Sequence, residues 1–378
     1  MFNKQIIVWE CVNVALTQRE KEILRLIKKN PMISQEELAK MLGISRSAVA
    51  GHIANLMKKG FILGRGYVVR DLKGVTVIGG ANIDIKGKPY KELKQHTSNP
   101  GYINIAPGGV GRNIAHNLAQ LNVPVTFLSV VGNDDEGRRL LEETRQAGVN
   151  VEQVVISNTR RTGIYLAILN AIGDMDIALS GMDILEELNI QYLESKIEVI
   201  KNSEIVVFDS NIPEESIRYV TELCYNNNIP VVVDPVSIDK AQKLKGVLDK
   251  IDYITPNKEE LESITGMSVA DDEEMKKAVK YLRDRGVKNV IVTLGERGVY
   301  ISSEELEKFI EPYRTEIVDA TGAGDALTAG LVYGIFNGYS LEVSVKMGLA
   351  AASLTISSPY TVNPFLNENQ LKNMVKEI

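Results

Sequence analysis

The sequence has few cysteines and lacks a long apolar run. Of its 378 residues only Cys11 and Cys224 are cysteines, and their separation fits neither a disulfide framework nor a metal-binding spacing. No stretch near eighteen residues is continuously apolar, so we expect no membrane-spanning helix. Glu10 and Asn13 interrupt the apolar start of the chain, and no basic region or cleavage site follows, so no secretory signal is expected. These absences favour a protein of the reducing cytoplasm.

The composition is typical of a globular protein, with 44% apolar and 24% charged residues. The length predicts two domains or one large domain. Charge is uneven along the chain. Residues 17–70 carry 11 Lys and Arg against 4 Asp and Glu, a net charge of +7, whereas the whole chain has a net charge of -6. A basic front and an acidic body indicate two modules with different partners.

Residues 17–72 have the pattern of a small helical domain. Thr17 with Glu20, and Ser34 with Glu37, have the spacing of capping boxes at helix starts. Ser45 follows a short turn and can cap a third helix. Apolar residues three or four positions apart predict the buried stripes of these helices: Ile23, Leu26 and Ile27; Leu38, Met41 and Leu42; Val49, Ile53 and Leu56.

Residues 61–70 alternate apolar and polar side chains around Gly64-Arg65-Gly66, which is typical of a two-stranded wing. The segment therefore resembles a winged helix-turn-helix DNA-binding domain, preceded by an extension of residues 1–16. Among the outward residues of the third helix only Arg46 is a typical base or phosphate contact. DNA is thus a candidate partner, and a packing or dimerisation module without DNA contact is the alternative.

From residue 73 the pattern changes to short β-branched runs that alternate with helical segments. Runs that are apolar throughout predict parallel strands buried on both faces, so the body is expected to be a doubly wound, mostly parallel α/β sheet. Residues 83–88, 102–106 and 164–169 alternate instead and predict a small side sheet or lid. The predicted strands of the main sheet are 75–78, 205–208, 231–233, 251–254 and 290–292, and the predicted helices are 214–226, 272–285 and 325–337.

A glycine-rich segment, Asp319-Ala-Thr-Gly-Ala-Gly-Asp325, follows the strand-like residues 316–318 and opens a helical run. Its glycines allow the N–H groups of Ala323, Gly324 and Asp325 to point at one place, where an anion such as a phosphoryl group can bind. Asp325 beside this place can accept the proton of an attacking hydroxyl group. The alternative is that Asp325 only stabilises the helix dipole. Because no Walker lysine follows the glycines, the segment is not a P-loop.

Two more glycine-rich segments follow predicted strands. Residues 79–84 are Gly-Gly-Ala-Asn-Ile-Asp, and residues 107–113 are Pro-Gly-Gly-Val-Gly-Arg-Asn, which lead into a helix ending near Leu121. With Asp325 they make three sites on one rim of strand ends. In this order the motifs resemble the ribokinase-like (PfkB) family of carbohydrate kinases over roughly residue 74 to the C-terminus. The resemblance implies a ribokinase-like fold with a β lid and ATP-dependent phosphorylation of an alcohol.

The resemblance also assigns roles to residues. It implies that Asp325 is the catalytic base and that Gly322, Ala323 and Gly324 form the anion hole. It implies that ATP, Mg²⁺ and a monovalent cation such as K⁺ are the cofactors, with magnesium held through water. The residues matched are Asn82, Asp84, Gly108, Gly109 and Asn113 in the sugar pocket; Asn257 and Glu260 near the phosphates and magnesium; Thr293, Gly295 and Gly298 in the nucleotide-binding turn; and Asp319 and Thr321 in the monovalent cation site.

One departure from ribokinases concerns the acceptor. Asn211 stands where ribokinases carry a glutamate after the central strand, so the substrate is expected to differ from free ribose. Arg112, residues 174–176, residues 361–364 and the attached helix-turn-helix are most similar to the pseudouridine kinases of this family. That resemblance implies phosphorylation of the 5'-hydroxyl group of pseudouridine.

The lid residues Thr162 and Tyr165 would then face the base, and surface positions are their alternative. Other acceptors, such as ribose, inosine or adenosine, remain open. So does a transcriptional regulator that only senses such a ligand. A homodimer paired through the lid sheets is also expected from the resemblance.

Overall fold

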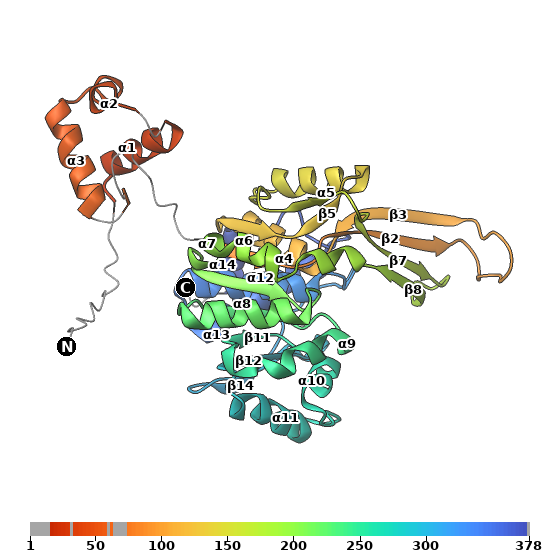
Figure 1. The fold of residues 1–378 in the computed structure, drawn as a ribbon. Coiled ribbons are helices and arrows are strands. Elements are labelled where there is room, and N and C mark those ends of the chain that lie inside the picture. Colours follow the sequence, from red (N-terminus) through yellow and green to blue (C-terminus); the bar gives the residue numbers. More distant parts are fainter. Residues whose placement is uncertain (1–15, 31–32, 59–60, 63–73, 376–378) are drawn as a thin grey trace. The chain divides into compact units, whose positions relative to one another are not determined.

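The computed structural model describes residues 16–30, 33–58, 61–62 and 74–375 (Figure 1). The chain divides into two compact units, Met1–Leu72 and Lys73–Ile378. Within the described ranges no helix has the length and apolar character needed to cross a membrane.

The first unit is a group of three helices around a small apolar core. Both predicted capping boxes are present, at Thr17 and at Ser34, and Gly43 ends the second helix in the left-handed conformation. The prediction that Met41 is buried is wrong: it is 62% exposed, because Leu38 and Ala39 supply the inward face of that helix. The predicted wing lies outside the described residues, except for residues 61 and 62. The helices are α1 (Gln18–Lys29), α2 (Gln35–Leu42) and α3 (Arg46–Lys58).

The second unit is built on one large sheet with the strand order β14-β13-β12-β11-β10-β9-β1-β4. The six strands from β4 to β12 are parallel, and β13 and β14 are antiparallel at one edge. The strand observed at the predicted position 251–254 is shorter than expected, because it includes only the last two of these residues. The strands are β1 (Val75–Ile78), β4 (Val125–Leu128), β9 (Ile205–Asp209), β10 (Val231–Asp234), β11 (Tyr253–Ile254), β12 (Asn289–Thr293), β13 (Val299–Ser302) and β14 (Glu307–Ile310).

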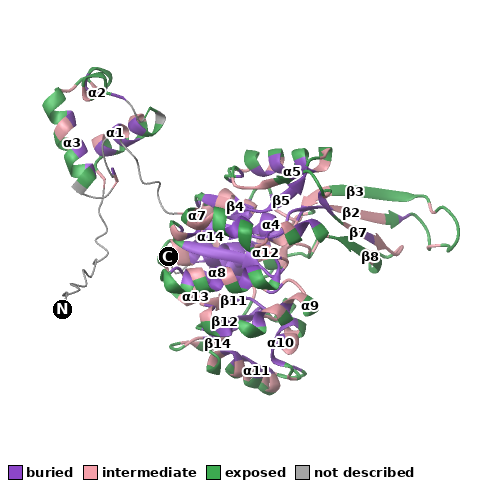
Figure 2. Ribbon diagram, viewed as in Figure 1, coloured by how far each residue is buried: buried purple, intermediate pink, exposed green. Residues whose placement is uncertain are grey.

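Helices cover both faces of this sheet, which explains why its central strands are apolar throughout (Figure 2). One apolar core joins the sheet to α6, α8, α10 and α11, and the other joins it to α4, α5, α12, α13 and α14. The helices are α4 (Val110–Gln120), α5 (Asp135–Gln146), α6 (Ile190–Ser195), α7 (Ile197–Lys201), α8 (Glu214–Asn226), α9 (Ile238–Ala241), α10 (Lys258–Thr265), α11 (Asp272–Asp284), α12 (Ala323–Phe336), α13 (Leu341–Ile356) and α14 (Glu368–Met374).

The predicted lid is a four-stranded sheet that extends from the body of the unit (Figure 1). Its order is β3-β2-β7-β8, with β2 (Asn82–Pro89), β3 (Gly101–Gly108), β7 (Gly163–Leu169) and β8 (Met175–Gly181). Because side chains alternate along a strand, the register puts Asp84 and Tyr165 on one face. The opposite face is apolar and largely exposed at Ile103, Ile177 and Leu179.

Two short strands, β5 (Val130–Gly132) and β6 (Val155–Ser157), pair with each other beside the lid. The predicted strand at residues 316–318 is absent: the backbone there is irregular, although Val318 donates a hydrogen bond to the Ile356 carbonyl. Ile317 and Val318 are exposed, so their apolar character does not reflect a place in the sheet.

Candidate active site

Asp209 joins the strand ends on which the site is built. It is the last residue of β9 and is fully buried. Its Oδ2 accepts hydrogen bonds from the N–H groups of Gly80 (2.9 Å) and Gly111 (2.7 Å), and its Oδ1 accepts one from Asn211 (2.9 Å). Burial raises the pKa of this carboxyl group, and the N–H donors oppose that rise. One side chain therefore holds together the turns after β1 and β9 and the start of α4.

Four predicted sugar-pocket residues lie at the base of the lid. Asn82 faces Gly108 in the register, and its Nδ2 donates a 2.6 Å hydrogen bond to Asp84 Oδ1. A Cβ atom on Gly108 would come within 2.3 Å of Asp84 Oδ2, so glycine is needed beside that carboxylate. Gly109, with φ 101°, packs closely against the Gly80 carbonyl. Asp84 is only half-buried, so its oxygens can accept hydrogen bonds from hydroxyl groups of a ligand.

Asn113 and Asp325 are 212 positions apart in the sequence and in direct contact. Asn113 Nδ2 donates a 2.8 Å hydrogen bond to Asp325 Oδ2. Beside them Arg112 is 4% exposed, and its guanidinium group donates to Asn113 Oδ1 (3.2 Å), the Pro107 carbonyl (3.4 Å) and Thr144 Oγ1 (3.3 Å). Burial lowers the pKa of Arg112 to about 10, against the effect of nearby carboxylates. The buried cation thus fixes the side chain that contacts Asp325.

Asp325 lies in the first turn of α12, which Gly322 caps in the left-handed conformation (φ 82°). The N–H groups of Gly324 and Asp325 have no hydrogen-bond partner among the residues that the structure describes. The N–H group of Ala323 instead donates to the Ala320 carbonyl at 3.3 Å. Two of the three predicted donors therefore remain available to an anion at this helix start.

The pKa of the Asp325 carboxyl group is raised to about 7. Burial is the main cause, the charges of Asp209 and Asp84 contribute, and the hydrogen bond from Asn113 opposes the rise. The side chain keeps partial contact with solvent, so its proton can exchange. A carboxyl group with a pKa near neutrality is suited to accept a proton from a hydroxyl group.

Asp234 lies near two other carboxyl groups, those of Asp325 and Glu260. Asp234 ends β10, and its pKa is raised well above the usual range by burial and then by the charges of Asp325 and Glu260. Glu260 is 6% exposed and forms the capping box of α10 with Asn257: each side chain accepts the other residue's N–H group, at 2.8 and 3.0 Å. Burial also raises the pKa of Glu260. Neighbouring buried carboxylates of this kind fit a divalent cation, which would relieve their repulsion.

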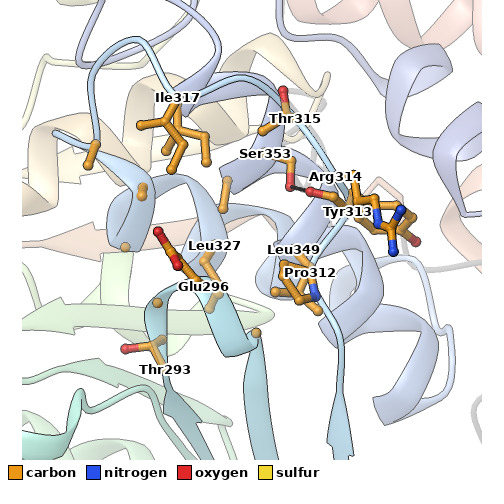
Figure 3. A pocket seen from close by; sticks show the side chains of 17 residues that line it. Thr293, Glu296, Pro312, Tyr313, Arg314, Thr315, Ile317, Leu327, Leu349 and Ser353 are labelled. Carbon is orange, nitrogen blue, oxygen red and sulfur yellow. Dashed lines mark hydrogen bonds between the residues drawn. The ribbon is translucent and has the colours of Figure 1, made fainter.

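A cavity of about 640 Å³ lies between the turn after β12 and the start of α12 (Figure 3). The predicted nucleotide-binding residues Thr293, Gly295 and Gly298 line it, together with Ala323 and Gly324 of the proposed anion hole. The cavity therefore joins a space of ligand size to the N–H groups at the helix start. Much of its remaining wall is apolar: Pro312, Ile317, Leu327, Leu349, Ala352 and Ile356.

Two predicted substrate-binding residues have partners within the protein. Thr162 is 3% exposed, and its hydroxyl donates to Asp134 Oδ1 (2.5 Å) while accepting from the Gly132 N–H group (2.9 Å). The expectation that Thr162 faces a base is therefore corrected: its side chain closes a turn. Asn211 accepts a hydrogen bond at Oδ1 from Lys240, which leaves its amide N–H groups for a ligand.

The expected cation-site residues contact a lysine from the lid. Asp319 Oδ1 accepts a 2.8 Å hydrogen bond from the Thr321 N–H group. Lys86 of β2 donates from Nζ to Thr321 Oγ1 at 2.9 Å, and its Nζ lies 3.8 Å from Asp319 Oδ2. These contacts join the lid to the segment that precedes Gly322.

Five residues at the site have no role predicted from the sequence: Lys86, Arg112, Asp209, Asp234 and Lys240. Asp209 and Asp234 are the last residues of their strands, and the rule that ligands bind beyond strand carboxyl ends points to both. For Lys86 no local pattern was available, because its partner Thr321 is 235 positions away.

The fold and the site are those of an α/β phosphotransferase that has a glycine-capped helix start instead of a P-loop. The family model described as pfkB family carbohydrate kinase matches residues 72–368, and the chain belongs to this family. The model for winged helix-turn-helix DNA-binding domains matches residues 16–62. The predicted combination of a ribokinase-like fold with an N-terminal winged helix-turn-helix domain is confirmed.

Among curated relatives, the uncharacterized sugar kinase YeiI of Escherichia coli K12 is 40% identical over 95% of this chain and 99% of its own. The pseudouridine kinase of the same organism is 35% identical over 82% of this chain and 98% of its own. Among solved structures, Arabidopsis thaliana ribokinase complexed with ribose and ATP is 25% identical, with a TM-score of 0.70 over 81% of this chain and 99% of that chain. A putative ribokinase II from E. coli, solved in complex with ATP and Mg²⁺, has the same fold, with 20% identity and a TM-score of 0.69 over 81% of this chain and 100% of that chain.

Proposed function

We propose that this chain transfers the γ-phosphoryl group of ATP to the 5'-hydroxyl group of a ribonucleoside, with pseudouridine as the preferred acceptor. The observation that carries the proposal is the 2.8 Å contact between Asn113 and Asp325. It puts a carboxyl group with a pKa of about 7 beside an amide that can hold a sugar hydroxyl. Both lie at a helix start whose N–H groups at Gly324 and Asp325 have no partner in the described part of the chain. The 35% identity to a pseudouridine kinase supports a nucleoside acceptor.

Each residue has a physical role in this reaction. Asn82 and Asp84 hold two hydroxyl groups of the ribose ring through hydrogen bonds. Asp325 accepts the proton of the 5'-hydroxyl group, and the N–H groups of Gly324 and Asp325 stabilise the charge that develops on the phosphoryl oxygens. Arg112 is a positioning residue, because it holds Asn113 and contributes a positive charge beside Asp325.

We assign ATP to the 640 Å³ cavity, because Thr293, Gly295 and Gly298 line it and it reaches the helix start. Mg²⁺ would be held near Asp234 and Glu260, whose raised pKa values reflect burial and then neighbouring carboxylates. Such a cation usually keeps several water ligands and neutralises charge on the phosphates.

The choice of acceptor depends on the lid and on Asn211. With Oδ1 bonded to Lys240, Asn211 can donate from its amide, which suits a carbonyl or ring oxygen of a nucleoside. Tyr165 lies on the same lid face as Asp84 and is half-buried, so its ring can cover a base. Both features favour a nucleoside over free ribose.

The test is a kinase assay with ATP and Mg²⁺ over pseudouridine, uridine, inosine, adenosine and ribose, with phosphorus NMR of the product. We expect kcat/KM for pseudouridine to exceed that for the other acceptors by about tenfold or more, a difference of 1.4 kcal/mol, and phosphorylation at the 5' position. Asp325→Asn is the inactive control. If the chain phosphorylates none of the ribonucleosides, the proposal is refuted. A preference for ribose would move the assignment to a sugar kinase.

A second function is DNA binding by the first unit. Arg46, Ser47 and Gly51 are exposed on α3, the third helix of the matched helix-turn-helix model, and residues 17–70 carry a net charge of +7. We expect the full chain to bind duplex DNA with an affinity that falls as salt rises, and Arg46→Ala to weaken it. Fluorescence anisotropy at 50 to 200 mM salt measures this. If the chain does not bind DNA at the lowest salt concentration, the first unit has only a packing role.

We further propose a cytoplasmic homodimer. The apolar back face of the lid, with Ile103, Ile105, Ile177 and Leu179 at least half exposed, is suited to burial by the same face of a second copy. The free thiol of Cys224, with no disulfide among the described residues, is compatible with a reducing compartment.

A further inference from the structure

The strand that carries Asn82 and Asp84 also carries Lys86, and the three residues alternate onto one face of the lid. The Lys86 ammonium group lies 2.9 Å from Thr321 Oγ1 and 3.8 Å from Asp319 Oδ2. Its side chain is 28% exposed, and that of Asp319 is 38% exposed, so the pair is partly shielded from water. Thr321 and Asp319 belong to the segment that leads directly into Gly322 and the anion-binding helix start.

A monovalent cation was expected at this pair, and the residues present do not fit one. Asp319 Oδ1 is occupied by the Thr321 N–H group, and Oδ2 faces the lysine. Hydrogen bonds from Thr321 and then the charge of Lys86 lower the pKa of Asp319. Burial raises the pKa of Asp84, and the Asn82 hydrogen bond and then the Lys86 charge oppose that rise, so the ammonium group stabilises the charge of both carboxylates. A potassium ion at Oδ2 would lie beside a second cation and be repelled by it.

We propose that the Lys86 ammonium group takes the place of the monovalent cation at the 319–321 segment, so that phosphoryl transfer by this chain does not depend on K⁺. This inference rests on the proposed kinase function. Lys86 acts as a positioning residue: it neutralises Asp319 and holds Thr321, and thereby fixes the segment before the N–H groups of Gly324 and Asp325 at the start of α12.

A cation that is part of the lid has a consequence that a free ion lacks. Asn82 and Asp84, which hold the acceptor, lie four and two positions before Lys86 on the same strand. When β2 lies over the acceptor, the Lys86 ammonium group on the same strand lies at Thr321. Binding of the acceptor and ordering of the phosphoryl site are therefore linked through one strand.

The experiment compares wild type, Lys86→Met and the matched control Lys88→Met in tetramethylammonium chloride and in KCl at equal ionic strength. Lys88 is the next lysine on the same face of β2 and is exposed. We expect kcat of the wild type and of Lys88→Met to be the same in both salts. Lys86→Met should lose about tenfold or more in kcat without K⁺ and recover part of it in KCl.

Thermal unfolding of the protein without substrates gives a second readout. We expect KCl to leave the Tm of the wild type unchanged and to raise that of Lys86→Met. Activation of the wild type by K⁺, a rise of its Tm in KCl, or a Lys86→Met variant equal to the wild type would overturn the inference. If the wild type phosphorylates no nucleoside, the proposed function fails, while the Tm values still decide the role of Lys86.

Discussion

Replacing Asp325 with asparagine is expected to raise stability while removing activity. Burial raises the pKa of Asp325 from 3.8 to about 7, so the folded state holds its proton more tightly than the unfolded state. The stability that this proton contributes is present below pH 3.8 and is lost as the pH rises through 7. The full difference between the two pKa values corresponds to about 4 kcal/mol in the free energy of unfolding. Because Asp325 keeps partial solvent contact, we expect about 2 kcal/mol.

Urea unfolding of wild type and Asp325→Asn at pH 4.5, 6 and 8 measures this effect. The free energy of unfolding of the variant should exceed that of wild type only slightly at the lowest pH and by about 2 kcal/mol at pH 8, because asparagine never ionises. Its kcat should fall by about 10² to 10⁴, with acceptor affinity nearly unchanged. Asp135→Asn, whose side chain is 92% exposed, is the control for the same change of residue type outside the site. A variant that is less stable than wild type at pH 8, or that keeps a tenth of kcat, would refute the reasoning.

Three further substitutions test other parts of the structure. Gly322→Ala should lower kcat by about 100-fold and stability by about 2 kcal/mol, measured by initial rates and urea unfolding, because φ is 82° and the new Cβ would lie 2.0 Å from the Thr361 carbonyl oxygen. Asp209→Asn should cost about 3 kcal/mol in urea unfolding, because an amide cannot accept all three N–H groups, and a loss under 1 kcal/mol would contradict its role. Leu179→Asp, on the exposed lid face, should yield monomers in light scattering, and an unchanged dimer would place the interface elsewhere.

Helix starts and buried strands could be predicted from the sequence because a few neighbouring residues determine them. The capping boxes at Thr17 and Ser34 and the strand at Val75–Ile78 are in the predicted places. Residues 316–318 have similar apolar character but form no strand, because pairing depends on a partner that the local pattern does not show. Met41 has helical spacing, yet a helix of eight residues buries only a narrow face.

The candidate site also has features that a local pattern predicts and features that it does not. Glycines at Gly108 and Gly322 could be singled out because close approach and positive φ restrict the residue type locally. The contact partners of the functional groups could not be predicted locally. Asn113 contacts Asp325, which is 212 positions away, and Lys86 contacts Thr321, which is 235 positions away. Such pairs follow from the topology of the sheet and from the lid register, which a single sequence does not specify.

The charges of the site differ between its two sides. On the acceptor side each carboxylate has a fixed cation near it: Lys86 and Arg112 for Asp84, Arg112 for Asp325, and Lys240 for Asp209. These cations come from β2, α4 and α9, so each also holds one element of the rim in place.

On the nucleotide side the pKa values of Asp234 and Glu260 are lowered only by hydrogen bonds, from the backbone of Val236 and from Asn257. Keeping these carboxyl groups ionised without a cation is costly in a buried place, which is why their pKa values are raised. A metal ion bound there would remove that cost. This difference supports the proposed function, in which a neutral acceptor binds on one side and a metal-bound polyphosphate on the other.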